Sequence, residues 1–138
     1  MKRQLLIAGL VSVAAWVNGC IVIHTEEEPC RPVVVEPGDA TIREIDAVSR
    51  LSFDHDRQEG YERIARRDGL SDGAQVYLIE AVLKHLSFSN AQVSVLLTLV
   101  DNPCFSAAGE AALLDRLDRL AFEHEKRKIL DAVSARKG

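Results

Sequence analysis

Hydrophobic residues between positions 40 and 138 recur with helical spacing, and a similar short phrase interrupts them three times. One apolar stripe, with spacings of three and four residues, consists of Val76, Ile79, Val82 and Leu83. The interrupting phrases are L-S-F at 51–53, L-S-F at 86–88 and L-A-F at 120–122. Each phrase lies between two apolar stripes. The pattern predicts short helices joined in pairs by these three connectors.

The connectors recur at spacings of 35 and 34 residues, and the segments before them are also alike. The matching segments are I-D-A-V at 45–48, I-E-A-V at 79–82 and L-D-R-L at 114–117. Such a period is typical of stacked helical repeats. We therefore predict an all-α fold of six short helices, arranged as three tandem helical hairpins. Both a compact bundle and a short solenoid fit this pattern.

Polar residues mark the expected helix starts, because their side chains can accept hydrogen bonds from free backbone amides. The expected N-cap residues are Thr41, Asp54, Ser71, Ser89 and Ser106. Thr41 and Ser89 are followed three residues later by Glu44 and Gln92, as in a capping box. Gly69 is expected to adopt a left-handed conformation after a helix end.

The phenylalanines of the connectors, Phe53, Phe88 and Phe122, are expected to point into the core. An apolar residue just before an N-cap often packs against the first turns of its helix, as a hydrophobic staple. Residues 89–101 carry no charge before Asp101, so this helix is expected to be buried. Phe88, at its start, is therefore expected to be the most deeply buried of the three.

The N-terminus has the pattern of a bacterial lipoprotein signal peptide over residues 1–19. Lys2 and Arg3 precede a 13-residue stretch, Leu5–Val17, that is apolar except for Ser12. This stretch is shorter than the ~20 residues that span a bilayer as a helix. V-N-G-C at 17–20 then resembles a lipobox, in which Cys20 becomes the lipidated N-terminus. The alternative is a plain secretory signal in which Cys20 has no role.

The residues after Cys20 are expected to tether a helical domain, residues 39–138, to the membrane. The tether, residues 20–38, is rich in proline and glutamate. Palmitate and the other acyl chains on Cys20 would provide the membrane anchor. Ile21 is not the aspartate that retains lipoproteins of enterobacteria at the inner membrane, so the outer membrane is favoured. The net charge of −4 argues against a nucleic-acid partner.

Several short motifs resemble a bacterial and animal helical family known as domain of unknown function 4476. They are F-D-H-D-R at 53–57, L-S-D-G-A-Q-V at 70–76, L-S-F-S-N-A-Q-V at 86–93 and D-N-P at 101–103. The resemblance covers about residues 50–125. It implies an all-helical fold and secretion, and it transfers no catalytic residues. The chain lacks the aromatic pair that follows the family's D-x-x-N turn.

Motifs for catalysis, nucleotide binding and metal binding are missing from the sequence. His55 and His124, each flanked by acidic residues, are expected to lie in solvated first helical turns rather than in a metal site. We therefore expect no enzyme activity, cofactor or metal. The chain is expected to be a lipid-anchored envelope protein that binds a protein partner through its helices. The alternative is a small envelope hydrolase with an unrecognised site.

Cys30 and Cys104 remain once Cys20 is assigned to lipidation. An exported protein can form a disulfide between them, because the compartment is oxidising. The sequence leaves this disulfide and two free thiols open as alternatives. A reactive thiol at Cys104 would need a nearby base, and the neighbouring sequence offers none.

Overall fold

The computed structural model describes residues 40–138, and these residues form an all-α fold. Six α-helices and one short 3-10 helix follow in order: α1 (Ala40–Ser49), α2 (Asp54–Ala65), α3 (Asp72–His85), α4 (Ser89–Asp101), α5 (Ala107–Asp115), η1 (Leu117–Arg119) and α6 (Glu123–Ala135). No strand is present in this part of the chain. The predicted fold class and the six helices are confirmed.

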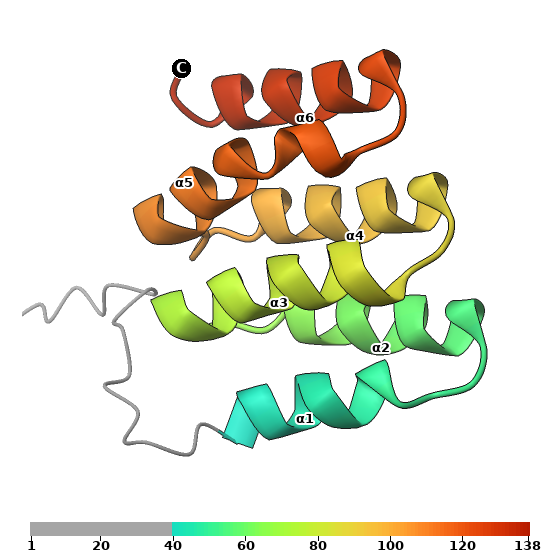
Figure 1. Cartoon of the computed structure of the whole chain (residues 1–138). Helices are drawn as coiled ribbons and strands as arrows, with labels where there is room; N and C mark the ends of the chain where they lie inside the picture. Colours follow the sequence, from blue (N-terminus) through green and yellow to red (C-terminus); the bar gives the residue numbers. More distant parts are fainter. Residues whose placement is uncertain (1–39) are drawn as a thin grey trace, which may run out of the picture.

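The helices alternate between two layers (Figure 1). In one layer α3 packs between α1 and α5, and in the other α4 packs between α2 and α6. The connectors from α1 to α2, from α3 to α4 and from α5 to α6 all turn at one edge of the stack, at the right of the view (Figure 1). The loops from α2 to α3 and from α4 to α5 turn at the opposite edge.

The core lies between the two layers and is almost entirely aliphatic. Its largest fully buried side chains include Ile45, Tyr61, Leu78, Leu96 and Ile129. Helix α4 buries Ala, Val and Leu side chains along its whole length, because it contacts α2, α3 and α6. The predicted burial of this uncharged helix is therefore confirmed.

Several of the predicted helix boundaries are also confirmed. The side chains of Ser71 and Ser106 accept hydrogen bonds at 3.1 Å from the amides of Ala74 and Gly109, respectively, and so cap α3 and α5. Gly69 has a φ angle of +74°, as expected for a left-handed residue after a helix. Serine caps and a glycine turn depend on local backbone geometry, which explains why the sequence alone predicts them.

Other predicted caps are wrong by one or two residues. Asp54 and Ser89 are the first residues of α2 and α4, and the N-cap positions belong to Phe53 and Phe88. Thr41 likewise lies inside α1, which begins at Ala40.

The same shift overturns the prediction that the connector phenylalanines belong to the core. Phe53, Phe88 and Phe122 are 71%, 63% and 55% exposed. A hydrophobic staple requires the apolar residue to lie just before the N-cap. Here each phenylalanine is itself the N-cap residue, so its side chain leaves the helix end towards solvent. The leucines at the start of the second and third connectors, Leu86 and Leu120, are buried instead.

Two buried amide side chains fix the loops at the opposite edge. Gln75 donates to the carbonyl oxygens of Leu70 and Cys104 at 3.0 and 2.9 Å, and its own oxygen accepts from the Ser106 amide at 2.9 Å. One side chain therefore satisfies groups in both loops. Helix α5 approaches it closely, because a Cβ atom added at Gly109 would lie 2.7 Å from the Gln75 side-chain oxygen.

Asn102 has a similar role one residue after α4. Its amide nitrogen donates to the carbonyl oxygens of Ala65 and Arg67, both at 2.8 Å, and its oxygen accepts from the Cys104 amide at 2.8 Å. The Q-V and D-N-P motifs of the sequence therefore have a structural explanation, since Gln75 and Asn102 satisfy buried backbone groups that would otherwise be costly.

Candidate functional site

The phenylalanines of the three connectors are the most exposed of the large hydrophobic side chains in residues 40–138. We call Phe53, Phe88 and Phe122 the aromatic edge. Their connectors lie one above another along one side of the molecule (Figure 1). Each phenylalanine immediately precedes a helix of the same layer, and packed neighbouring helices are about 8–10 Å apart. We therefore expect the three side chains of the aromatic edge to form a row with an interval of about that distance.

Stability does not account for a phenylalanine at these positions. The N-cap favours Ser, Thr, Asp or Asn, and these residues are worth about 1 kcal/mol over residues that cannot accept the amide hydrogen bond. None of the three phenylalanines makes a side-chain cap bond. A large exposed aromatic side chain also gains little from burial. Each of the three helices α2, α4 and α6 therefore lacks the side-chain hydrogen bond that a polar N-cap residue would provide.

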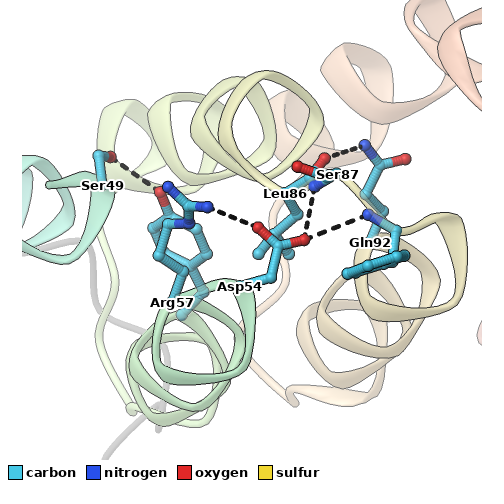
Figure 2. A network of polar contacts seen from close by, with 8 residues as sticks. Ser49, Asp54, Arg57, Leu86, Ser87 and Gln92 are labelled. Atoms are coloured by element: carbon cyan, nitrogen blue, oxygen red, sulfur yellow. Dashed lines mark hydrogen bonds and ion pairs between the residues drawn. The ribbon is translucent and has the colours of Figure 1, made fainter. Parts of the chain in front are cut away.

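A carboxylate from α2 fixes the middle connector (Figure 2). Asp54 accepts hydrogen bonds from the backbone amides of Ser87 and Phe88, at 2.7 and 3.3 Å, and from the Arg57 side chain at 2.6 Å. Burial raises the pKa of Asp54, but the hydrogen bonds from Ser87, Arg57 and Phe88 outweigh it and leave the pKa below its ordinary value. The first residue of α2 thus satisfies free amides at the start of α4.

The same connector is held from the α4 side. Gln92 donates to the carbonyl oxygen of Leu86 at 2.8 Å (Figure 2). The predicted capping box between Ser89 and Gln92 is therefore wrong, because Gln92 bonds the chain before the helix rather than an N-cap amide. With Asp54 on one side and Gln92 on the other, the backbone that presents Phe88 is fixed.

Charged residues border the aromatic edge on both sides. The first turns of α2 and α6 contain acidic residues, of which Asp56 and Glu123 are exposed. The ends of α1 and α3, in the other layer, carry the exposed cations Arg50 and Lys84. This separation is incomplete at the third connector, where the exposed Asp118 and Arg119 of η1 are neighbours in the sequence and Glu123 is ion-paired with Lys126 at 2.7 Å.

The histidines of the first helical turns do not converge. His55 lies 3.2 Å from the Glu59 carboxylate on α2, and the His124 ring lies 5.7 Å from the Phe122 ring on α6. Within residues 40–138 no group of three or more His, Cys, Asp or Glu side chains could hold a metal ion.

A shallow hollow of about 200 Å³ lies between α1 and the C-terminal half of α3. It is lined by Ser49, Tyr77, Glu80, Ala81, Lys84 and His85. Hydrogen bonds from Arg116 and Arg119 hold the pKa of Glu80 below its ordinary value. Burial, reinforced by the nearby positive charge of Lys84, lowers the pKa of His85. Glu80 is thus stabilised as an ion, which is unsuited to a general acid.

The predicted lipidation and disulfide sites lie largely beyond the part of the chain that the structure describes. Cys20 and Cys30 fall outside residues 40–138. Cys104 lies in the loop from α4 to α5 and is 9% exposed. Both assignments therefore stay predictions.

Sequence reasoning missed the contribution of Asp54 and the exposure of the phenylalanines. The recurrence of phenylalanine in all three connectors was the available signal. A core position and a binding position would both produce this recurrence, so the sequence could not distinguish them.

Among residues 40–138 no helix is long and apolar enough to cross a membrane. Comparison of the chain with protein-family models, with curated proteins and with solved structures found no match.

Proposed function

We propose that this chain is a lipid-anchored envelope protein whose helical domain binds a protein partner through the aromatic edge. The observation that carries the proposal is the exposure of Phe53, Phe88 and Phe122, each more than half exposed, at equivalent positions of one edge. Exposed aromatic side chains in a rigid setting are typical anchors of protein interfaces, because they bury a large area at small entropic cost.

The size of the aromatic edge is consistent with a binding surface. A phenylalanine side chain buries roughly 150–250 Å². With exposed fractions of 55–71%, the three side chains together offer roughly 300–450 Å² of apolar surface. Exposed apolar patches of this size on a monomer are often functional.

The hydrolase that the sequence left as an alternative gains no supporting observation from residues 40–138. The hollow between α1 and α3 brings together a carboxylate bound by two arginines and a lysine next to a histidine, with no arrangement of nucleophile, base and oxyanion donors. We therefore propose a binding protein rather than an enzyme.

Lipid attachment is the second element of the proposal. Its support is the sequence of residues 1–20, with a short apolar stretch followed by V-N-G-C. A proline-rich and glutamate-rich tether, residues 20–38, would then connect the anchor to the helical domain. By the identity of Ile21 the proposed location is the outer membrane.

Site-specific photo-crosslinking in living cells tests the proposed function. A photoreactive phenylalanine analogue in place of Phe88 is expected to give a covalent adduct with one partner protein, identified by mass spectrometry. The control is the same analogue at Leu130 of α6, which is 43% exposed and lies about two helical turns from the aromatic edge. Identical adducts at both positions, or none at Phe88, would contradict the proposal.

A further inference from the structure

We propose that the partner presents a single amphipathic α-helix, with apolar residues about every seventh position, that lies along the aromatic edge. This inference rests on the proposed binding function and specifies the shape of the partner. It follows from the area of the aromatic edge, its interval, its neighbouring charges and the rigidity of its middle connector.

The exposed area favours a single segment over a globular surface. Contact with the three phenylalanines would bury roughly 600–900 Å² when both partners are counted, twice the exposed area of the edge. Stable interfaces between folded proteins, including dimers, bury at least about 1,200 Å². The aromatic edge by itself is therefore too small for a second copy of the chain and is suited to a short segment.

The interval between the phenylalanines favours a helix over a strand. The three side chains come from the N-cap positions of adjacent helices of one layer, so we expect their attachment points to be about 8–10 Å apart, the usual distance between packed helices. Residues seven apart in an α-helix are about 10.5 Å apart and lie on nearly the same face. In an extended strand, residues about 10 Å apart are three positions apart, and these point to opposite faces. A strand therefore cannot place successive side chains on all three phenylalanines.

The charged residues beside the aromatic edge predict which charged residues the partner helix carries. Beside Phe53 and Phe88, the exposed cations Arg50 and Lys84 lie at the ends of α1 and α3, and the exposed Asp56 lies in the first turn of α2. Beside Phe122 the charges are mixed, because η1 carries both Asp118 and Arg119 and Glu123 is ion-paired with Lys126. A complementary helix carries acidic residues along the flank of its apolar stripe that faces Arg50 and Lys84, and basic residues along the flank that faces Asp56. Opposite charges at these distances mainly improve specificity and the rate of association.

The middle of the aromatic edge is held in place before any partner binds. Asp54 bonds the amides of Ser87 and Phe88, and Gln92 bonds the carbonyl of Leu86. Both bonds belong to the connector that presents Phe88 (Figure 2). Because this backbone is already ordered, binding at Phe88 does not carry the entropic cost of ordering it. Phe88, between the other two phenylalanines, is therefore the expected centre of the interface.

Synthetic peptides provide the test. The probe is a hydrocarbon-stapled helix of eighteen residues with leucine at the second, ninth and sixteenth positions, lysines on one flank and glutamates on the other. A second peptide has the same composition, but its central leucine is moved by two positions. This change places that leucine on the opposite face of the helix from the other two. Fluorescence anisotropy measures the affinity of each peptide for the full chain in phosphatidylcholine nanodiscs. We expect saturable binding of the first peptide and at least tenfold weaker binding of the second.

Substitutions on the protein complete the experiment. Phe88→Ser is expected to weaken binding of the first peptide tenfold or more. Phe53→Ser and Phe122→Ser are expected to weaken it as well, and they provide the same information if Phe88→Ser does not fold. Leu130→Ser removes an exposed apolar residue outside the aromatic edge and is expected to leave binding within twofold.

Four outcomes would overturn the inference. Equal affinity for both peptides would show that the seven-residue spacing does not matter, and unchanged binding by all three serine variants would exclude the aromatic edge. Quenching of a Phe88→Trp variant by brominated lipid in the nanodisc, without any peptide, would assign the edge to a membrane surface. If neither peptide binds but photo-crosslinking at Phe88 still captures a partner, the helix inference fails while the proposed function stands.

Discussion

Arg136 and Asn102 make equivalent hydrogen bonds to the ends of two neighbouring helices of one layer. Arg136 donates to the carbonyl oxygens of Val100 and Asn102 at 2.5 and 2.8 Å, at the end of α4. Asn102 donates to the carbonyl oxygens of Ala65 and Arg67 at the end of α2. The accepting residues are 35 positions apart in both cases, which is the spacing of the first two connectors. Each side chain thus satisfies the free carbonyls of the preceding helix in its layer.

We expect Asn102→Ala to lower the free energy of unfolding by about 2–4 kcal/mol, because it removes the hydrogen bonds to a buried carbonyl, a partly buried carbonyl and a buried amide. Arg136→Ala should cost less, since Arg136 is exposed and water can replace its guanidinium. Urea denaturation measures both changes. Asn90→Ala, at an exposed position of α4, is the matched control and should stay within about 0.5 kcal/mol of the parent protein.

Asp54 should make stability depend on acidic pH. Its pKa is lowered in the folded protein, so its contribution is present above its ordinary unfolded pKa of about 3.9 and is lost as the pH falls through the folded value. We expect Asp54→Asn to be less stable than the parent by about 1–2 kcal/mol at pH 7. The difference should shrink steadily below about pH 4. Urea melts from pH 7 to pH 2.5 test this, with the exposed Asp56→Asn as control.

A difference between parent and Asp54→Asn that stays constant down to pH 2.5 would show that the carboxylate charge does not stabilise the connector. In that case the geometry of the hydrogen bonds from residue 54, which asparagine preserves only in part, would account for the difference in stability.

Removing the aromatic side chains should have little effect on folding. Because Phe88 is 63% exposed, we expect Phe88→Ala to change the free energy of unfolding by less than about 1 kcal/mol. A buried phenylalanine would cost about 3–5 kcal/mol on the same substitution. Thermal melts distinguish these outcomes. Leu96→Ala, at a fully buried position of α4, is the positive control and should be strongly destabilising.

The proposed lipoprotein anchor makes Cys20 essential for membrane attachment. We expect Cys20→Ser to abolish incorporation of radiolabelled palmitate and to leave the precursor uncleaved by the lipoprotein-specific peptidase. Labelling that persists in this variant would refute lipidation at Cys20. A variant that loses labelling but is still cleaved would instead support the plain secretory signal.

The predicted disulfide joins Cys30 of the tether to Cys104 of the helical domain. Mass spectrometry of the alkylated, unreduced protein should identify a linked pair of peptides. In the chain-entropy model a loop of this length stabilises the fold by ~4.5 kcal/mol, so Cys30→Ser should lower the melting temperature markedly. Alkylation of both cysteines without prior reduction would contradict the prediction.

The sequence alone determined the all-α secondary structure and the burial of α4. Apolar spacing fixes helix faces, and serines or glycines fix the ends of helices, because both effects act within one or two turns. The uncharged run of α4 likewise predicts its central place, since an element without a polar face must be covered on several sides. These features need no information on which helices become neighbours.

Only the tertiary structure decided the role of the connectors. A shift of one residue in the helix start moved Phe53, Phe88 and Phe122 from the staple position to the N-cap, and thereby from the core to the surface. Asp54 could not be assigned to the Ser87 and Phe88 amides beforehand, because a contact across 33 residues depends on how α2 and α4 pack. A sequence pattern locates a helix start only to within one or two residues. An error of one residue is enough to change whether a side chain at that start points into the core or towards solvent.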